Sequence, residues 1–225
     1  MGKRYSDSCY LKDAALGLAA LCFFGCGDLM KTDPQESMRR AISNNSAAGV
    51  KELLDKGFPV NFQNSGGRTL LMSAVTKNSG EVIKVLLENK ADLTLRDKKR
   101  QTALHLAALW SNPETVKLLL DNGAQANSKD YLSWSPLMWA AIRDRKVAAA
   151  LIDGGAAVNF TDANRNTPMI LAAGHGHDDI VQLLLDRGAD PSMANKEGLN
   201  AQATAEHKGY TALAEFLKSK TARNP

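Results

Sequence analysis

The sequence predicts an all-α solenoid of about six helix-turn-helix units, and two internal series of residues support this prediction. In the first series, a Leu-Leu or Leu-Ile pair is followed a few residues later by the residue that ends a helical segment. These end residues are Gly57, Lys90, Gly123, Gly155 and Gly188. The second series comprises Thr69, Thr102, Ser135, Thr167 and Asn200. Both series step by 33, 33, 32 and 33 residues. Because two independent landmarks share one period, the body of the chain is one repeat array and not two separate domains.

Composition excludes several other classes of protein. The 225 residues are 44% hydrophobic and 23% charged, which excludes wholesale disorder, collagen and a polytopic membrane protein. All three cysteines lie within the first 26 residues, so no disulfide or zinc framework can hold the remainder together.

Residues 1–25 are predicted to be a secretory signal peptide. Basic residues open the chain, and an uncharged apolar run follows from Ala14 to Cys26. This run of about 13 residues is shorter than the roughly 20 that a membrane-spanning helix needs, so export and cleavage are favoured. The pair Gly25-Cys26 resembles the lipobox of bacterial lipoproteins. The resemblance implies cleavage before Cys26, a lipid on its thiol, and a short tether over residues 26–34.

Two alternatives remain for this segment. The opening Met1-Gly2-Lys-Arg-Tyr-Ser6 also matches the loose pattern for N-myristoylation, and the apolar run could serve as an uncleaved anchor. Cleavage before Cys26 would remove three basic and two acidic residues, which changes the net charge from +4 to about +3. So small a charge gives no support to nucleic-acid binding.

Within each unit, the residue types predict the elements in order. A Ser or Thr hydroxyl caps the first helix, and Pro136 and Pro168 occupy a position where a missing N–H costs nothing. Paired alanines then allow a second helix to pack closely. Leucines 118–120 and 183–185 are expected to fill the space between units. A residue in the left-handed conformation ends the second helix, and an extended finger leads to the next unit.

The repeat domain is expected over residues 35–219, followed by a flexible tail over 220–225. The first unit runs from about Asp33 to Asn64, and the five later units end near residues 97, 130, 162, 195 and 219. The two terminal units depart from the pattern, as capping units do. The 32-residue unit loses one position near Ile142 to Arg145, which should shorten the turn between its helices.

Three heptapeptides identify the family that the array resembles. They are Thr102-Ala-Leu-His-Leu-Ala-Ala108, Ser135-Pro-Leu-Met-Trp-Ala-Ala141 and Thr167-Pro-Met-Ile-Leu-Ala-Ala173. Together with Gly176-His177 they resemble the ankyrin repeat over about residues 33 to 219. The resemblance implies helix pairs joined by β-hairpin fingers, and a protein-binding surface. It also assigns structural roles to one set of positions: Thr69, Thr102, His105, Ser135, Thr167 and His177.

Catalysis is not expected, and neither a cofactor nor a metal is predicted. No nucleophile or carboxylate pair gathers around the four histidines, and no phosphate-binding or zinc-protease motif occurs. His105 occupies the ankyrin Thr-x-x-His position, where the ring helps to order the turn. A metal-binding or enzymatic protein using His175, His177 and Asp178 stays as an alternative.

The ankyrin resemblance places the binding surface on a concave face made by the finger tips and the exposed ends of the first helices. Aromatic and arginine side chains dominate binding energies because they bury much area for few lost rotamers. The proposed partner-binding residues are Lys98, Lys99, Trp110, Tyr131, Leu132, Trp134, Trp139 and Arg143. Other positions on this face are Ser65, Arg68, Lys77, Gln101, Leu109, Asn164, Asn166 and His175. Trp134 lies where the fold is expected to leave the side chain free, whereas packing between helices is the alternative for Trp139.

These features predict an exported, lipid-anchored, non-catalytic protein that binds a protein partner through repeats 3 and 4. Its expected location is the bacterial cell envelope, facing the periplasm, with the membrane contacted through the N-terminal lipid. The ankyrin resemblance implies two roles, support of a periplasmic enzyme or neutralisation of a toxin. A monomer is expected, and the alternative is a cytosolic or secreted ankyrin effector or scaffold.

Overall fold

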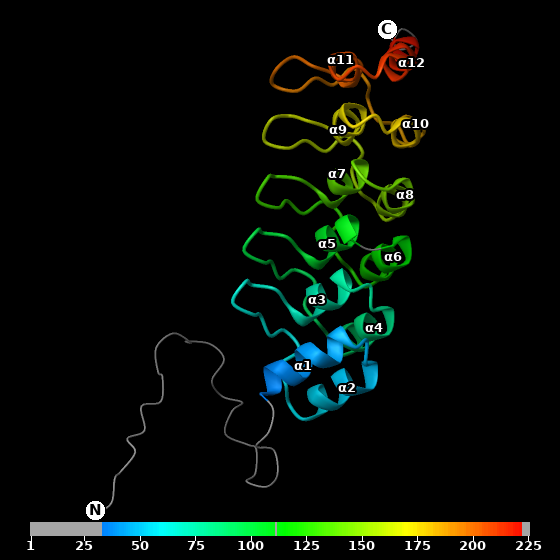
Figure 1. The fold of residues 1–225 in the computed structure, drawn as a ribbon. Coiled ribbons are helices and arrows are strands. Elements are labelled where there is room, and N and C mark those ends of the chain that lie inside the picture. The colour runs from blue at the N-terminus through cyan, green and yellow to red at the C-terminus, as the bar shows by residue number, and fades with distance from the viewer. Residues whose placement is uncertain (1–32, 111, 222–225) are drawn as a thin grey trace, which may run out of the picture.

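The protein is a single stack of helix pairs with fingers projecting from one side (Figure 1). The computed structural model describes residues 33–110 and 112–221. Over these residues the predicted all-α solenoid of about six units is confirmed. The predicted signal peptide, Cys26 and all but the last two tether residues lie outside the described residues.

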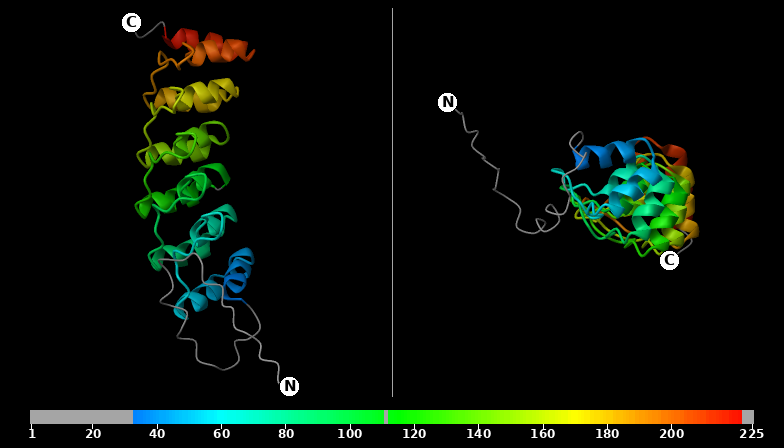
Figure 2. Two further views of the ribbon diagram at one scale, coloured as in Figure 1. Left: turned by 90° about the vertical axis from the view of Figure 1, so that its left-hand side faces the viewer. Right: turned by 90° about the horizontal axis from the view of Figure 1, so that it is seen from below.

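Each unit has an inner helix, next to the fingers, and an outer helix behind it. In chain order the pairs are α1 (Pro34–Ser43) with α2 (Ala47–Asp55), α3 (Leu70–Thr76) with α4 (Gly80–Glu88), α5 (Ala103–Trp110) with α6 (Pro113–Asp121), α7 (Pro136–Ala141) with α8 (Arg145–Asp153), α9 (Pro168–Gly174) with α10 (Asp178–Asp186), and α11 (Ala201–His207) with α12 (Thr211–Thr221). Successive units rise along one axis with a gradual rotation, as the two views of Figure 2 show.

Side-chain caps begin most of the inner helices as predicted. The hydroxyls of Thr69 and Thr167 accept the backbone N–H three residues later, at 3.1 and 3.2 Å. Thr102 differs, because its hydroxyl lies 2.9 Å from Nδ1 of His105. Ser135 corrects the prediction, since it stands at the N-cap of α7 but its buried hydroxyl has no hydrogen-bond partner.

The outer helices end as predicted, in left-handed residues. Gly57, Gly123, Gly155 and Gly188 all have positive φ angles, between 82° and 92°. Lys90 takes the same place after α4 with a φ of 62°. Glycine is therefore preferred at this position for its backbone freedom, although a lysine adopts the same conformation in the second unit.

A repeated side-chain turn builds each finger. The residues at 64, 97, 130, 162 and 195 are all Asn or Asp, and the side chain of each accepts the N–H groups two and four residues later, at 2.8–3.0 Å. The N–H of each also donates to the carbonyl four residues on. In the part of the chain that the structure describes, the single β-bridge joins Gln63 and Thr69, so the fingers are tight turns and not β-hairpins with strands.

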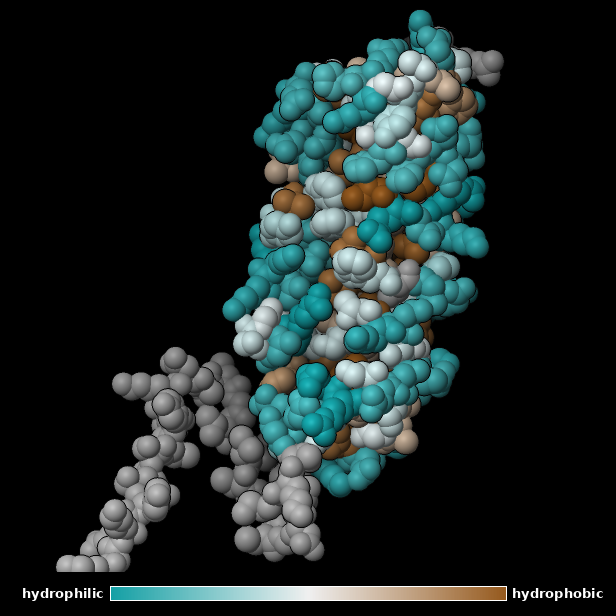
Figure 3. Space-filling model, viewed as in Figure 1, coloured by the Kyte–Doolittle hydropathy of each residue, from teal (hydrophilic) through white to brown (hydrophobic). Residues whose placement is uncertain are grey.

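One hydrophobic core runs the length of the stack. It extends from Met38 on α1 to Leu217 on α12, and each inner helix contacts the inner helix of the next unit. Leu119 is fully buried, and its neighbours Leu118 and Leu120 are half-buried and pack against the core. In Figure 3 the visible surface is mostly hydrophilic, and hydrophobic side chains show along the middle of the stack and at its finger edge.

Three boundaries differ from the sequence expectation. The helices begin at Pro34 and continue to Thr221, so one residue assigned to the tether and two assigned to the tail are helical. The missing position of the 32-residue unit shortens α7 to six residues, against seven in α9. The turn after α7 also lacks the left-handed residue that Asn78 and Gly176 supply in other units. Within residues 33–110 and 112–221, no helix is both long and apolar enough to cross a membrane.

Candidate protein-binding site

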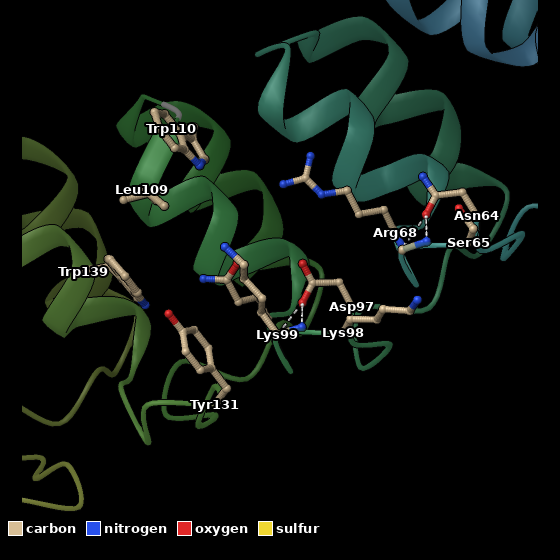
Figure 4. Close-up of a pocket in the computed structure, with 12 residues that line it drawn as sticks. Asn64, Ser65, Arg68, Asp97, Lys98, Lys99, Leu109, Trp110, Tyr131 and Trp139 are labelled. Atoms are coloured by element: carbon tan, nitrogen blue, oxygen red, sulfur yellow. Dashed lines mark hydrogen bonds between the residues drawn. The ribbon is translucent and has the colours of Figure 1, made fainter.

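A hollow of about 500 Å³ lies on the finger side of the stack, across the second to fourth units (Figure 4). It is lined by Asn64, Ser65, Gly66, Arg68, Asp97, Lys98, Lys99, Gln101, Leu109, Trp110, Tyr131 and Trp139. The hollow therefore includes residues of repeats 3 and 4 and extends one unit further toward the N-terminus.

The cationic side of the hollow is carried by two neighbouring fingers. Arg68 ends the first of these fingers, and Lys98 and Lys99 form the tip of the second. Asp97 does not neutralise them through a side-chain ion pair, because its Oδ1 accepts the N–H groups of Lys99 and Gln101, at 2.8 and 3.0 Å. Over residues 33–110 and 112–221, every ion pair of the chain lies elsewhere, so these three cations face solvent without a carboxylate partner.

The aromatic side is formed by the third and fourth units. Trp110, at the end of α5, is 56% exposed, and Tyr131, on the next finger, is 51% exposed. The guanidinium of Arg143 lies 5.2 Å from the centre of the Trp110 ring, which covers part of that ring with a cation. Large side chains exposed together in this way are typical of contact surfaces.

Two other tryptophans are held by buried carboxylates. The indole N–H of Trp139 donates to Oδ2 of Asp130 at 2.9 Å, and that of Trp134 donates to Oδ2 of Asp162 at 3.1 Å. The two rings pack together with centroids 4.7 Å apart. The expectation that the fold leaves residue 134 free is therefore wrong, because Trp134 joins two successive fingers. Trp139 packs against the core and also lines the hollow.

Main-chain hydrogen bonds fix the fingers that carry the hollow. The N–H of Lys98 donates to the carbonyl of Gly66 at 3.1 Å, and that of Tyr131 donates to the carbonyl of Lys99 at 3.0 Å. Between the next two fingers, within the described chain, the Trp134 side chain supplies the link in place of such a backbone bond. The cationic and aromatic sides are thus held in a fixed register.

His105 has a structural role beneath this surface. The ring is fully buried, Nδ1 accepts the N–H of Thr102 at 3.2 Å, and Nε2 lies 3.2 Å from the carbonyl oxygen of Trp134. A carbonyl can only accept, so Nε2 carries the proton and the ring is neutral. Burial is the main cause that lowers the pKa of His105 below its usual 6.5.

The remaining predicted residues divide into two groups. Leu132 and Arg143 are exposed beside the hollow without lining it, and Trp134 is half-buried between fingers. Four residues of the concave-face set, Ser65, Arg68, Gln101 and Leu109, line the hollow, although Gln101 is largely buried. Sequence reasoning missed Asn64, Gly66 and Asp97. The recurring Asn or Asp before each finger is the signal that could have located them.

The two histidines between α9 and α10 do not form a metal site with their neighbours. The rings of His175 and His177 lie parallel with centroids 6.2 Å apart, and Nδ1 of His175 lies 2.9 Å from the carbonyl of Leu171. His177 precedes α10 without a side-chain cap bond. Across residues 33–110 and 112–221, no group of three His, Cys, Asp or Glu side chains could hold a metal ion.

The stacked helix pairs, the fingers and the exposed groove define a helical repeat protein built for contact with other proteins. A family model described as "Ankyrin repeats (3 copies)" matches residues 38–130 and 129–195. The chain belongs to the ankyrin-repeat family. Ankyrin repeats are protein–protein interaction modules and are generally non-catalytic.

Several curated proteins are similar to part of the chain. Zygote-specific protein 3 of Chlamydomonas reinhardtii is 39% identical over 98 residues, which cover 43% of this chain and 26% of that protein. An ankyrin repeat-containing protein of Treponema pallidum is 40% identical over 78 residues, 34% of this chain and 26% of the relative. Human ankyrin repeat domain-containing protein 63 is 39% identical over 89 residues, 37% of this chain and 23% of the relative. The chain thus spans about a quarter of the length of these relatives.

One similar protein is an enzyme. The NAD-capped RNA hydrolase NUDT12 of Macaca fascicularis is 36% identical over 72 residues. These residues cover 32% of this chain but only 16% of the hydrolase. The similarity therefore concerns the repeats and gives no reason to assign hydrolase activity to this chain.

Proposed function

We propose that the protein is an exported, lipid-anchored binding protein that holds one protein partner against the concave face of its second to fourth units. The observation that carries this proposal is the pair of exposed aromatics, Trp110 and Tyr131, beside three unpaired cations in one hollow. Such groups are the usual centres of protein–protein interfaces. Repeats 3 and 4 supply the aromatic part, as the sequence suggested, and Arg68 extends the site by one unit.

The chemistry of the hollow favours binding over catalysis. Its lining includes no histidine or cysteine, and the one carboxylate, Asp97, already accepts two backbone N–H groups through Oδ1. The lining therefore offers mainly positive charge and aromatic surface, which suit contact with a partner.

The proposed anchor rests on the sequence of residues 1–26. Basic residues, an apolar run too short to span a bilayer, and Gly25-Cys26 together favour export and lipidation at Cys26. The repeat stack begins at Pro34, so only a short tether would separate it from the membrane surface. A membrane-bound binding protein of this kind could support a periplasmic enzyme or neutralise an incoming toxin.

Mass spectrometry of the mature N-terminus tests the anchor. We expect a chain that starts at an acylated Cys26, and Cys26→Ser should abolish both acylation and cleavage. A myristoylated Gly2 would instead support the cytosolic alternative, and an unmodified, uncleaved chain would contradict the proposed lipidation.

Affinity purification from membranes tests the binding face. We expect wild-type protein to enrich one partner, and Trp110→Ala combined with Tyr131→Ala to abolish the enrichment. Tyr210→Ala is the matched control, because it removes an exposed aromatic far from the hollow. Recovery of the partner by the double variant at the wild-type level would contradict the proposed face.

A further inference from the structure

We infer that the hollow binds an acidic, extended polypeptide segment that carries an apolar or aromatic side chain. This inference rests on the proposed function, since it names the chemistry of the partner that the same hollow accepts. Two observations support it. The carboxylates around the hollow accept hydrogen bonds from the protein itself, and the cations that line the hollow form no ion pair with a carboxylate of the described chain.

The carboxylates near the hollow all serve the fold. Asp130 is 1% exposed and Asp162 is 9% exposed, and each accepts an indole N–H in addition to two backbone N–H groups. Asp97 likewise uses Oδ1 for its own finger turn. The charges of Asp130 and Asp162 are therefore directed into hydrogen bonds within the protein and are poorly available to a partner, and Asp97 is the one carboxylate that lines the hollow.

The cations near the hollow are free of such bonds. Lys98, Lys99 and Arg68 line it, and no ion pair of the described chain includes them. Arg143 adds a positive charge over the face of Trp110. A partner that enters here meets three lining cations, Arg143 beside them, and one half-buried carboxylate, Asp97. The excess of positive charge makes an acidic partner electrostatically complementary.

The aromatic side of the hollow favours a partner that also carries an apolar or aromatic side chain. In Figure 4, Trp110, Tyr131 and Trp139 lie on one side of the site, Arg68 and Lys98 on the other, and Lys99 between them. A purely acidic chain would leave the rings without a contact. An apolar or aromatic side chain within the acidic segment would bury them.

The shape of the hollow favours an extended segment. It is shallow and crosses three successive units, and the backbone bonds of Lys98 to Gly66 and of Tyr131 to Lys99 fix the order of its parts. A chain that runs along the stack would place acidic residues over the first two fingers and its apolar side chain over the third. Because the fingers are already ordered, binding costs little rearrangement of this protein.

A single-stranded nucleic acid also combines negative charge with flat rings, but the chain favours it less. The net charge is only +4, and the cations gather over two fingers instead of along a continuous stripe. Nucleic-acid affinity depends on many phosphate contacts, which a hollow with three lining cations does not offer.

Fluorescence anisotropy with a labelled synthetic peptide tests the inference. The probe alternates Glu and Asp around a central Leu-Trp pair, and the full-length protein is the titrant. We expect saturable binding that weakens as salt rises, and a loss of at least about tenfold in affinity for Lys98→Glu combined with Lys99→Glu. The matched control is Lys117→Glu with Lys146→Glu, which makes the same charge change on the outer helices α6 and α8 and should leave affinity within about twofold.

Companion probes separate the possible failures. A peptide with Gln and Asn in place of the acids, and one with Ala in place of Leu-Trp, should both lose binding. Equal binding of the neutral peptide, an equal loss in the control variant, or tighter binding of oligothymidine would each overturn the inference. No binding of the acidic peptide, with partner capture still dependent on Trp110 and Tyr131, would overturn the acidic chemistry while leaving the proposed face intact.

Discussion

A buried, neutral histidine connects the repeat core to the binding face. His105 lies on α5, and its ring joins Thr102 in its own unit to the carbonyl of Trp134 in the next finger. Protonation would place a hydrogen on Nδ1, directly opposite the N–H of Thr102. The same contact that orders the turn therefore opposes the charged ring, in addition to the cost of burial.

The stability of the stack should consequently fall as the solution becomes mildly acidic. The pKa of His105 is lowered in the folded state, so below pH 6.5 the unfolded chain binds a proton at this residue more readily than the folded chain does. Proton binding therefore stabilises the unfolded state relative to the folded state. We expect the free energy of unfolding to decrease by up to about 1.4 kcal/mol per pH unit below 6.5. Urea unfolding at a series of pH values between 7.5 and 5.5 measures this slope.

His105→Met provides the control, because Met72 and Met138 occupy the same position in neighbouring units. This variant should lose the pH dependence between 7.5 and 5.5. Carboxylates whose pKa is lowered titrate well below that range, as with Glu36, whose hydrogen bonds to Arg39 and Arg40 lower its pKa to about 2. An unchanged slope in the variant would show that another group is responsible.

Single residues were predicted well where the cause is local. The caps at Thr69 and Thr167 and the structural role of His105 follow from bonds within one turn. The position of Trp134 was not predictable in this way, because its partner Asp162 lies 28 residues further along the chain. The unpartnered hydroxyl of Ser135 likewise depends on packing that no sequence pattern reports.

Two left-handed glycines, one between an inner and an outer helix and one after an outer helix, have different surroundings. Gly176 has a φ of +69°, and a Cβ at this position would meet the Tyr210 ring at 2.5 Å. Gly123, after α6, has a φ of +92° but no atom within 4 Å of its would-be Cβ. The two glycines therefore share a backbone requirement and differ in the space around them.

Alanine substitution separates these two requirements. Gly123→Ala should cost about 1 kcal/mol of unfolding free energy, from the left-handed backbone alone. Gly176→Ala should cost a further 1–2 kcal/mol or so, because Tyr210 must also move. Equal losses in urea unfolding would contradict the assigned role of the tyrosine.

At the scale of the whole molecule, stability depends on contacts between neighbouring units. Leu119 is fully buried in the core that runs through all six helix pairs, so Leu119→Asp would place a charge between units without a partner. We expect the unfolding free energy to fall by about 3–5 kcal/mol, the range for a buried charge left unpaired. Amide hydrogen exchange should show lost protection in α6 and in the flanking units together. Loss confined to α6 would contradict cooperative coupling.

The architecture of the molecule was predictable from its sequence because each unit repeats the same local solutions. The period of 33 residues, the alanine pairs and the helix-ending glycines all recur, and they fix the number and order of the helix pairs. The finer outline of the hollow was not predictable. It depends on side chains from three units that lie far apart in the sequence.

Site-specific photo-crosslinking in intact cells tests the central claim most directly. A photoreactive amino acid is placed at Trp110 or Tyr131 in the hollow, and at Lys117 or Lys146 on the outer helices. We expect the two hollow positions to crosslink to one and the same protein, and the outer positions not to crosslink to it. Crosslinks to that protein from the outer helices, with none from the hollow, would contradict the proposed binding face.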